Sequence, residues 1–193
     1  MNTKPRAGGL IRPLVLALAF AGAPVMAVAS ASTAATTTCA TTTAHWGSLA
    51  KSLNRLTSAP ISNVRAGRHP CFDRMVVNLK GKGAGYTVQY VSQVLSQGQG
   101  AVVPLRGGAK LDVVIKAPAN HINTGASTYN PANRRELVNV AGFSTFRQIA
   151  SGGSFESHTT IGLGVRARLP MRVFILDGPG AGSRVVIDVA HHW

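Results

Sequence analysis

The 193-residue sequence predicts an all-β protein built as a single antiparallel β-sandwich domain. In several segments apolar and polar side chains alternate, as in strands with one face buried and the other in water. Glycine and proline, 21 and 10 in number, separate these segments, and only one short stretch has helical spacing. Short strands divided by turns are typical of a sandwich or a barrel.

The first 31 residues have the features of a signal peptide. Three basic residues precede an apolar run over residues 14–29, which ends in two overlapping Ala-x-Ala sites at residues 27–31. An uncleaved membrane anchor is the alternative, but the run is shorter than the roughly 18 residues that span a bilayer. We therefore expect cleavage at one of these two sites, with residues 1–31 taken as the signal peptide, followed by export, and no transmembrane segment in the mature chain.

Residues 32–44 are almost entirely Ala, Ser and Thr and predict a tether to a domain over residues 45–193. At the start of this domain, apolar residues recur at helical spacing, which predicts a short amphipathic helix over residues 45–56 that caps the core. The residues of this pattern are Trp46, Leu49, Leu53 and Leu56.

Alternation predicts strands over residues 72–80, 86–94 and 110–117. The side chains expected to face the core along these strands are Met75, Val77, Leu79, Tyr86, Val88, Tyr90, Leu111, Val113 and Ile115. Residues 118–136 have no period and are interpreted as a surface excursion or a functional loop. Strand-like runs then resume over residues 137–149, 155–168, 171–177 and 184–190.

Two of these strands resemble each other. Residues 74–79 and 184–189 both read as Arg, three apolar residues, Asn or Asp, and one more apolar residue. Two strands under one burial pattern would look alike in this way, and so would a pseudo-symmetric pair at the two ends of one domain. Asp188 lies inside the second run, where an unpaired carboxylate is costly, so we expect it to pair with Arg74 or Arg166.

The mature chain is strongly basic. The sequence has 20 Lys and Arg and 6 Asp and Glu, and 3 basic residues lie in the signal peptide, so 17 minus 6 leaves +11. Such a surface attracts anionic wall polymers and lipid headgroups, although a basic protein can also owe its charge to solubility alone. Arg166, Arg168 and Arg172 are a candidate site for phosphates or carboxylates, or else a solvated strand face.

Cys39 and Cys71 are the only two cysteines, and an even pair in an exported chain predicts a disulfide. Closing this loop stabilises a fold by roughly 3 to 4 kcal/mol in the chain-entropy model.

Several motifs, in this order, resemble the AMIN-like domains of secreted actinobacterial proteins. The resemblance implies a small β-sandwich related to the modules of bacterial wall amidases, which bind cell-wall material. It covers roughly residues 46–193, and no amidase domain accompanies it in this chain. The motifs are Trp46-Gly47-Ser48-Leu49, Ala66-Gly67-Arg68-His69, Cys71-Phe72-Asp73-Arg74, Gly85-Tyr86-Thr87-Val88, Pro104-Leu105-Arg106-Gly107-Gly108-Ala109, Gly162-Leu163-Gly164-Val165-Arg166, Arg172-Val173-Phe174 and Val186-Ile187-Asp188-Val189-Ala190-His191.

Catalytic spacing is missing from the sequence. It contains no Gly-x-Ser-x-Gly and no His-Glu-x-x-His motif. Glu136 and Glu156 are the only glutamates, and a glycosidase needs such a pair roughly 5 to 9 Å apart, whereas Glu136 is expected in a salt link with neighbouring arginines. His191 and His192 are interpreted as a terminal surface pair, and we expect neither a metal nor a cofactor.

We therefore expect a secreted or envelope-associated, non-enzymatic domain that binds peptidoglycan or an anionic wall polymer through its basic surface. Nucleic acid is not expected as a partner. Two alternatives stay open: a wall hydrolase that uses His121, Glu136 and His158, and an adaptor or inhibitor of another secreted protein.

Overall fold

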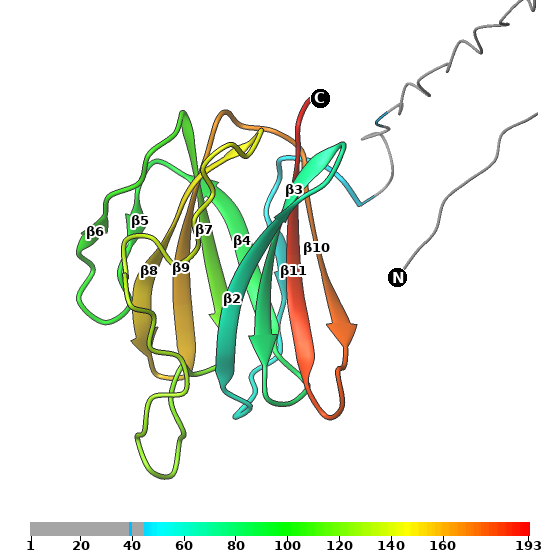
Figure 1. The fold of residues 1–193 in the computed structure, drawn as a ribbon. Helices are drawn as coiled ribbons and strands as arrows, with labels where there is room; N and C mark the ends of the chain where they lie inside the picture. Colours follow the sequence, from blue (N-terminus) through cyan, green and yellow to red (C-terminus); the bar gives the residue numbers. More distant parts are fainter. Residues whose placement is uncertain (1–38, 40–44) are drawn as a thin grey trace, which may run out of the picture. The chain divides into compact units, whose positions relative to one another are not determined.

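The computed structural model describes Cys39 and residues 45–193, so the signal peptide and all of the tether except Cys39 lie outside the described residues. The described part is all-β and contains no helix, with the strands shown in Figure 1. They are β1 (Lys51–Leu53), β2 (Ile61–Arg68), β3 (Phe72–Leu79), β4 (Gly85–Val91), β5 (Val94–Leu95), β6 (Val102–Val103), β7 (Ala109–Lys116), β8 (Phe146–Phe155), β9 (His158–Val165), β10 (Met171–Asp177) and β11 (Ser183–Ala190).

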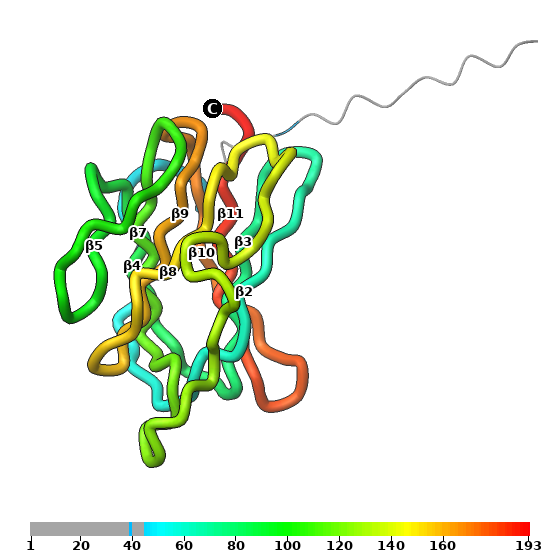
Figure 2. Tube along the Cα trace, turned by 60° about the vertical axis from the view of Figure 1, so that its left-hand side comes forward, coloured from blue at the N-terminus to red at the C-terminus, as the bar shows by residue number. Residues whose placement is uncertain are grey.

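Two antiparallel sheets face each other, which confirms the predicted sandwich (Figure 1). One sheet has five strands in the order β1-β4-β7-β9-β8, and the other has four in the order β10-β11-β3-β2. A small third sheet, β5-β6, lies beside the five-stranded sheet, on the side away from the four-stranded one (Figures 1 and 2).

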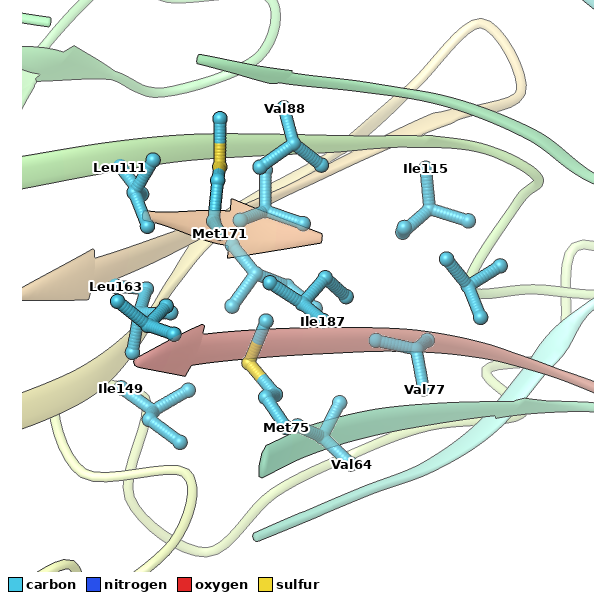
Figure 3. Packing of buried hydrophobic residues seen from close by; sticks show 14 of the residues in the cluster. Val64, Met75, Val77, Val88, Leu111, Ile115, Ile149, Leu163, Met171 and Ile187 are labelled. Atoms are coloured by element: carbon cyan, nitrogen blue, oxygen red, sulfur yellow. The ribbon is translucent and has the colours of Figure 1, made fainter. Parts of the chain in front are cut away.

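The core fills the space between the two sheets. Met75, Val77 and Ile187 come from the four-stranded sheet and meet Leu111 and Leu163 from the five-stranded sheet (Figure 3). All five of these side chains are fully buried. Each of the nine side chains predicted to face inward belongs to this core or packs against it, because every second residue of a strand faces the same side.

The helix predicted over residues 45–56 is wrong. Lys51–Leu53 instead forms β1, which pairs with β4, and Gly47 exchanges two backbone hydrogen bonds with Met171 of β10, of 3.1 and 2.9 Å. Leu49 is 75% exposed, although the helical pattern placed it against the core. A short isolated helix is marginal, and the sheet edges offer this segment backbone partners from distant parts of the chain.

Residues 137–145, which were predicted to begin a strand, are irregular, and β8 starts only at Phe146. Together with the aperiodic segment before them they cover the side of the sandwich between β2 and β8, as Figure 2 shows. Thr128 donates to the carbonyl of Ile61 in β2 at 2.7 Å, and the N–H of Leu137 donates to Ile149 in β8 at 2.8 Å. This excursion therefore closes the core.

Two tyrosines of β4 bond to β10 and to the segment that precedes it. The hydroxyl of Tyr86 donates to the carbonyl of Val173 at 3.2 Å, and that of Tyr90 donates to the carbonyl of Leu169 at 2.8 Å. Burial raises the pKa of both hydroxyls. The folded protein therefore favours the neutral phenol form of both tyrosines.

The two similar strand sequences lie side by side. β3 pairs with β11 in antiparallel register, so that Arg74 opposes Asp188 and Asn78 opposes Arg184. The polar end of each run therefore faces the arginine of the other. The likeness is that of two neighbouring central strands under the same burial pattern, related by a local pseudo-twofold.

Candidate functional site

A pocket of about 570 Å³ lies beside residues 139–147. This segment leads into β8 at the upper end of the sandwich in Figure 1. Val140, Phe143 and Phe146 give it an apolar floor, and the two phenyl rings stack with their centroids 6.0 Å apart. The other lining residues are Arg106, Glu136, Asn139, Ala141, Gly142 and Arg147. The pocket thus combines an apolar base with two arginines and one carboxylate.

A crossing of two glycine-containing segments brings Arg106 to this pocket. Residues 104–108 run over the outer face of β9, where a Cβ on Gly164 would lie 2.0 Å from the carbonyl oxygen of Arg106. Gly162 makes room for the Leu105 side chain, whose nearest carbon would be 2.8 Å from an added Cβ. Only glycine fits such a close approach. Two of the motifs that carry the family resemblance are therefore in direct contact.

Four arginines bond to residues 139–147, and we name Arg68, Arg106, Arg147 and Arg166 the arginine collar. The side chains of Arg68 and Arg147 donate to backbone carbonyls of this segment at 2.9–3.3 Å. Arg106 donates to the carbonyl of Arg147 at 3.0 Å, and the backbone N–H of Arg166 donates to the carbonyl of Thr145 at 2.8 Å. These bonds fix three collar side chains to one irregular segment, whereas Arg166 is bonded to it by its backbone and its guanidinium donates to the carbonyl of His191.

Glu136 is the one carboxylate that pairs with the collar among the described residues. It forms an ion pair with Arg106, which is distant in sequence, whereas the predicted salt link was with the neighbouring Arg134 and Arg135. This contact raises the pKa of Arg106. Because the other three collar arginines have no carboxylate partner in the described part of the chain, the collar carries an excess of positive charge.

Asp73 anchors the segment from the core side. It is fully buried, and its carboxylate accepts hydrogen bonds from the backbone N–H groups of Thr145 and Phe146 at 2.6 and 3.0 Å. The ring of His191 lies 3.2 Å away from the same carboxylate. His191 is only 8% exposed, so its interpretation as a surface residue is wrong. Sequence reasoning missed Asp73, whose signal was its position in phase with Met75 and Val77 on the inward face of a strand.

The three arginines of the predicted anion site have different partners. Arg166 and Arg168 were expected on one strand face, but β9 ends at Val165 and both lie in the bend that follows. The guanidinium of Arg166 donates to the carbonyl of His191. That of Arg168 lies 5.1 Å from the ring centroid of Tyr90. Arg172 is on β10 and has a carboxylate partner of its own.

That partner is Asp188, which is fully buried on the outer face of the four-stranded sheet. Arg74 donates two hydrogen bonds to its carboxylate, of 2.7 and 2.9 Å, and Arg172 donates a third, of 2.8 Å. The structure thus contains the expected pair of Asp188 with Arg74 and adds Arg172 to it. Hydrogen bonding to Asp188 raises the pKa of Arg74. Both guanidinium groups also lie over Phe72 and Phe174, at 5.1–5.6 Å from the ring centroids.

The predicted disulfide is confirmed. Cys39 and Cys71 are bonded, with their Cα atoms 5.3 Å apart. Cys71 directly precedes β3, and its carbonyl accepts from the N–H of His191 at 2.9 Å. The disulfide therefore joins Cys39 to the same end of the sandwich as the collar.

The three residues of the alternative hydrolase site are placed in separate surroundings. His121 is exposed in the loop after β7, and the ring of His158 lies 2.8 Å from the carbonyl of Glu156 in the β8–β9 turn. Glu136 pairs with Arg106. Within the described residues no hydrogen bond or ion pair joins any two of the three, and Glu156 is not bonded to Glu136 either. The described residues also contain no cluster of three potential metal ligands.

Fold and site together define a small antiparallel β-sandwich module with a basic, arginine-rimmed pocket at one end. The family model for the AMIN-like domain matches residues 59–191, which is more than half of the chain. The chain therefore belongs to the AMIN-like domain family, whose members are in general associated with the cell wall or envelope. No curated protein and no solved structure matches it.

The matched residues begin just before β2 and end just after β11. The first motif of the resemblance, at residues 46–49, precedes them, and the other motifs lie within them. Among the described residues, no helix is both long and apolar enough to cross a membrane.

Proposed function

We propose that this protein is a secreted, non-enzymatic module that associates with the cell envelope by binding peptidoglycan or an anionic wall polymer at the arginine collar. The observation that carries the proposal is the charge imbalance of this end of the sandwich, where four arginines meet one carboxylate. The family's general association with the cell wall supports the same conclusion.

The acidic residues elsewhere do little to offset this charge. Of the 6 Asp and Glu, Asp73 and Asp188 are fully buried, and each is bonded to groups of the fold. Exposed basic side chains therefore dominate the surface potential. Carboxylate and phosphate groups of a wall polymer are the ligands that a guanidinium fork binds best.

The bonds that fix the collar should increase its affinity. Arg68 and Arg147 are held by backbone carbonyls, so a polymer that binds them freezes fewer side-chain rotamers than it would on free arginines. Of the three arginines predicted from sequence, Arg166 belongs to the collar. Arg172 contributes less, because its guanidinium is already bonded to Asp188.

A sedimentation assay with purified cell walls tests this proposal. Binding should be strong at low salt and weaken as salt is added, because exposed charges are screened over about 8 to 10 Å at ordinary ionic strength. Replacing two collar residues, Arg68→Gln with Arg147→Gln, should reduce binding by about tenfold, which corresponds to about 1.4 kcal/mol.

Two matched variants serve as controls. Arg68→Lys with Arg147→Lys retains the charge but loses the guanidinium forks and the carbonyl bonds, so its binding should fall between that of the native chain and that of the glutamine pair. Arg55→Gln with Lys80→Gln removes two exposed charges at the opposite end of β3 and should have little effect. Equal losses from the collar pair and this distant pair would show that only net charge matters, and the collar would no longer be the site.

The non-enzymatic part of the proposal has its own test. The intact protein is incubated with purified walls, and the release of soluble sugar or peptide is measured. We expect none. Release that is abolished by Glu136→Gln would instead support the hydrolase alternative. A stoichiometric secreted protein recovered with the intact domain, in place of wall material, would support the adaptor alternative.

A further inference from the structure

A second pocket lies against the hairpin of β5 and β6. We name this hairpin, residues 94–103, the flap. The flap packs on the outer face of the five-stranded sheet through an apolar cluster of Val94, Val103 and Ala150. Its tip is fixed by Gln97, whose N–H donates to the carbonyl of Gly152 at 2.8 Å and whose side chain donates to the Thr160 hydroxyl at 2.9 Å. The flap is thus firmly docked.

Beside the flap lies a pocket of about 490 Å³, within the size range of small-molecule sites. Its polar side chains are Gln93, Ser96, Gln97, Asp112 and Thr160, and its apolar ones are Val91, Leu95 and Val114. No lysine or arginine lines it, although the protein as a whole is basic. The chemistry of this pocket therefore differs from that of the collar.

Asp112 is the unusual residue of this pocket. It lies on β7 between Gln89 of β4 and Gly162 of β9, on the outward-facing side of the sheet. Its Oδ1 atom is buried and has no hydrogen-bond partner in the described structure. Desolvation raises the pKa of this carboxyl group. An acceptor without a donor is costly, and the carboxyl group that carries this atom lines the pocket, so a donor bound there would reduce the cost.

We propose that the flap pocket binds an uncharged, hydroxyl-rich ligand such as a sugar ring, with Asp112 accepting a hydrogen bond from a ligand hydroxyl. Four of the polar lining residues are amides or alcohols, which both donate and accept, and hydroxyl groups match them in both roles. The aliphatic side chains of Val91, Leu95 and Val114 can cover the apolar face of a ring.

An amine is the competing ligand for a lone carboxylate, and the lining argues against it. An ammonium group needs acceptors only, whereas the amide N–H₂ and hydroxyl groups beside Asp112 are also donors. The net charge of the mature chain, 17 minus 6 or +11, also repels a cation from the surface.

Sugar binding is tested by titrating the mature domain with a panel of neutral monosaccharides and N-acetylated trisaccharides, followed by amide chemical shifts. We expect millimolar or tighter binding, with shift changes confined to the flap and to β7 around Asp112, and no dependence on salt. Asp112→Leu should weaken binding by about tenfold or more, and Gln93→Ala by a smaller factor.

Three controls make the result decisive. Asp112→Asn keeps an acceptor oxygen and the shape of the site, so it should bind more weakly than the native chain but better than Asp112→Leu, even if the latter folds poorly. Gln99→Ala removes another exposed flap glutamine that does not line this pocket and should change nothing. The collar variant Arg68→Gln with Arg147→Gln should bind sugars normally.

Two outcomes would overturn the inference: no shift changes with any sugar of the panel, or shift changes at Asp112 with ethanolamine but not with sugars. Because the collar variant and the flap variants are measured in both assays, failure of sugar binding and failure of wall binding are distinguishable.

Discussion

The outer faces of the two sheets each carry an aspartate on a central strand, and the hydrogen bonding of the two carboxylates differs. On the four-stranded sheet, Asp188 accepts three hydrogen bonds from Arg74 and Arg172. On the five-stranded sheet, Asp112 leaves a buried oxygen without any partner in the described structure. The first carboxylate is part of the fold, whereas the second is the group that we propose a ligand contacts.

The two faces are also covered in different ways. Side chains cover the four-stranded face, where Val76 and Val186 point outward yet are only 3% and 1% exposed. Backbone covers part of the five-stranded face, because residues 104–108 cross β9 at Gly162 and Gly164. The difference lies in the two aspartates and in what covers each sheet, because the four-stranded sheet also has buried polar atoms without a partner in the described structure, Asn78 Oδ1 and Arg184 Nε.

The largest effect on stability should come from adding a side chain where residues 104–108 cross β9. In Gly164→Ala the new Cβ would meet the carbonyl oxygen of Arg106 at 2.0 Å, and this oxygen cannot move without shifting the whole segment. We expect a loss of about 3 kcal/mol in the free energy of unfolding, measured by denaturant titration.

Gly67→Ala is the matched control on the other sheet. A Cβ on Gly67 would have no atom within 4 Å, so we expect a change within about 0.5 kcal/mol. Similar losses for both variants would mean that the crossing is not tightly packed.

Asp188→Asn should leave charged groups without a partner on the four-stranded face, as Asp112 is on the five-stranded face. The amide cannot neutralise two arginines, and breaking such a buried pair costs about 3 kcal/mol. We place the expected loss somewhat lower, at about 2 kcal/mol, because the side chains of Arg74 and Arg172 are 24% and 31% exposed and can recover some hydration. Thermal unfolding measures it.

The double variant Asp188→Asn with Arg172→Gln provides the check. Removal of one surplus charge should recover part of the lost stability. If the double variant is instead less stable than Asp188→Asn by as much as Asp188→Asn is less stable than the native chain, Arg172 stabilises the fold through its ring contacts alone.

Asp112→Asn should have the smallest effect and the opposite sign. Because burial raises the pKa of Asp112 in the folded state, its contribution to stability is fully present below the unfolded pKa, about 4, and is lost as pH rises through the folded pKa. The variant should therefore be more stable than the native chain at neutral pH, by about 1 kcal/mol.

Unfolding curves of the two proteins at neutral and at acidic pH measure this difference. It should shrink towards zero near pH 3, where both side chains are neutral. A gain that is independent of pH would show that the charge of Asp112 is not its cause.

The inward-facing residues of the sandwich followed from the sequence because alternation with a period of two directly reports which side of a strand is buried. Asp188 was expected in an ion pair for a similar reason, since a charge inside an apolar strand needs a partner. The choice between Arg74 and Arg166 was open, because it depends on the register of β11 against β3. The helix wrongly predicted over residues 45–56 shows the same limit. Helical spacing is a local pattern, whereas the strands that pair with this segment are distant in the sequence.

By itself, then, the sequence determined the sandwich, the disulfide and the excess of positive charge, because each depends on residue type and short-range pattern. The positions of those charges depended on tertiary structure. Arg68, Arg106, Arg147 and Arg166 are spread over about 100 residues, and they meet because one irregular segment, anchored by Asp73, supplies carbonyls to them. In the same way Asp112 looked like an ordinary outward-facing strand residue, and only the tertiary structure placed it in a pocket beside the flap, with one carboxylate oxygen buried.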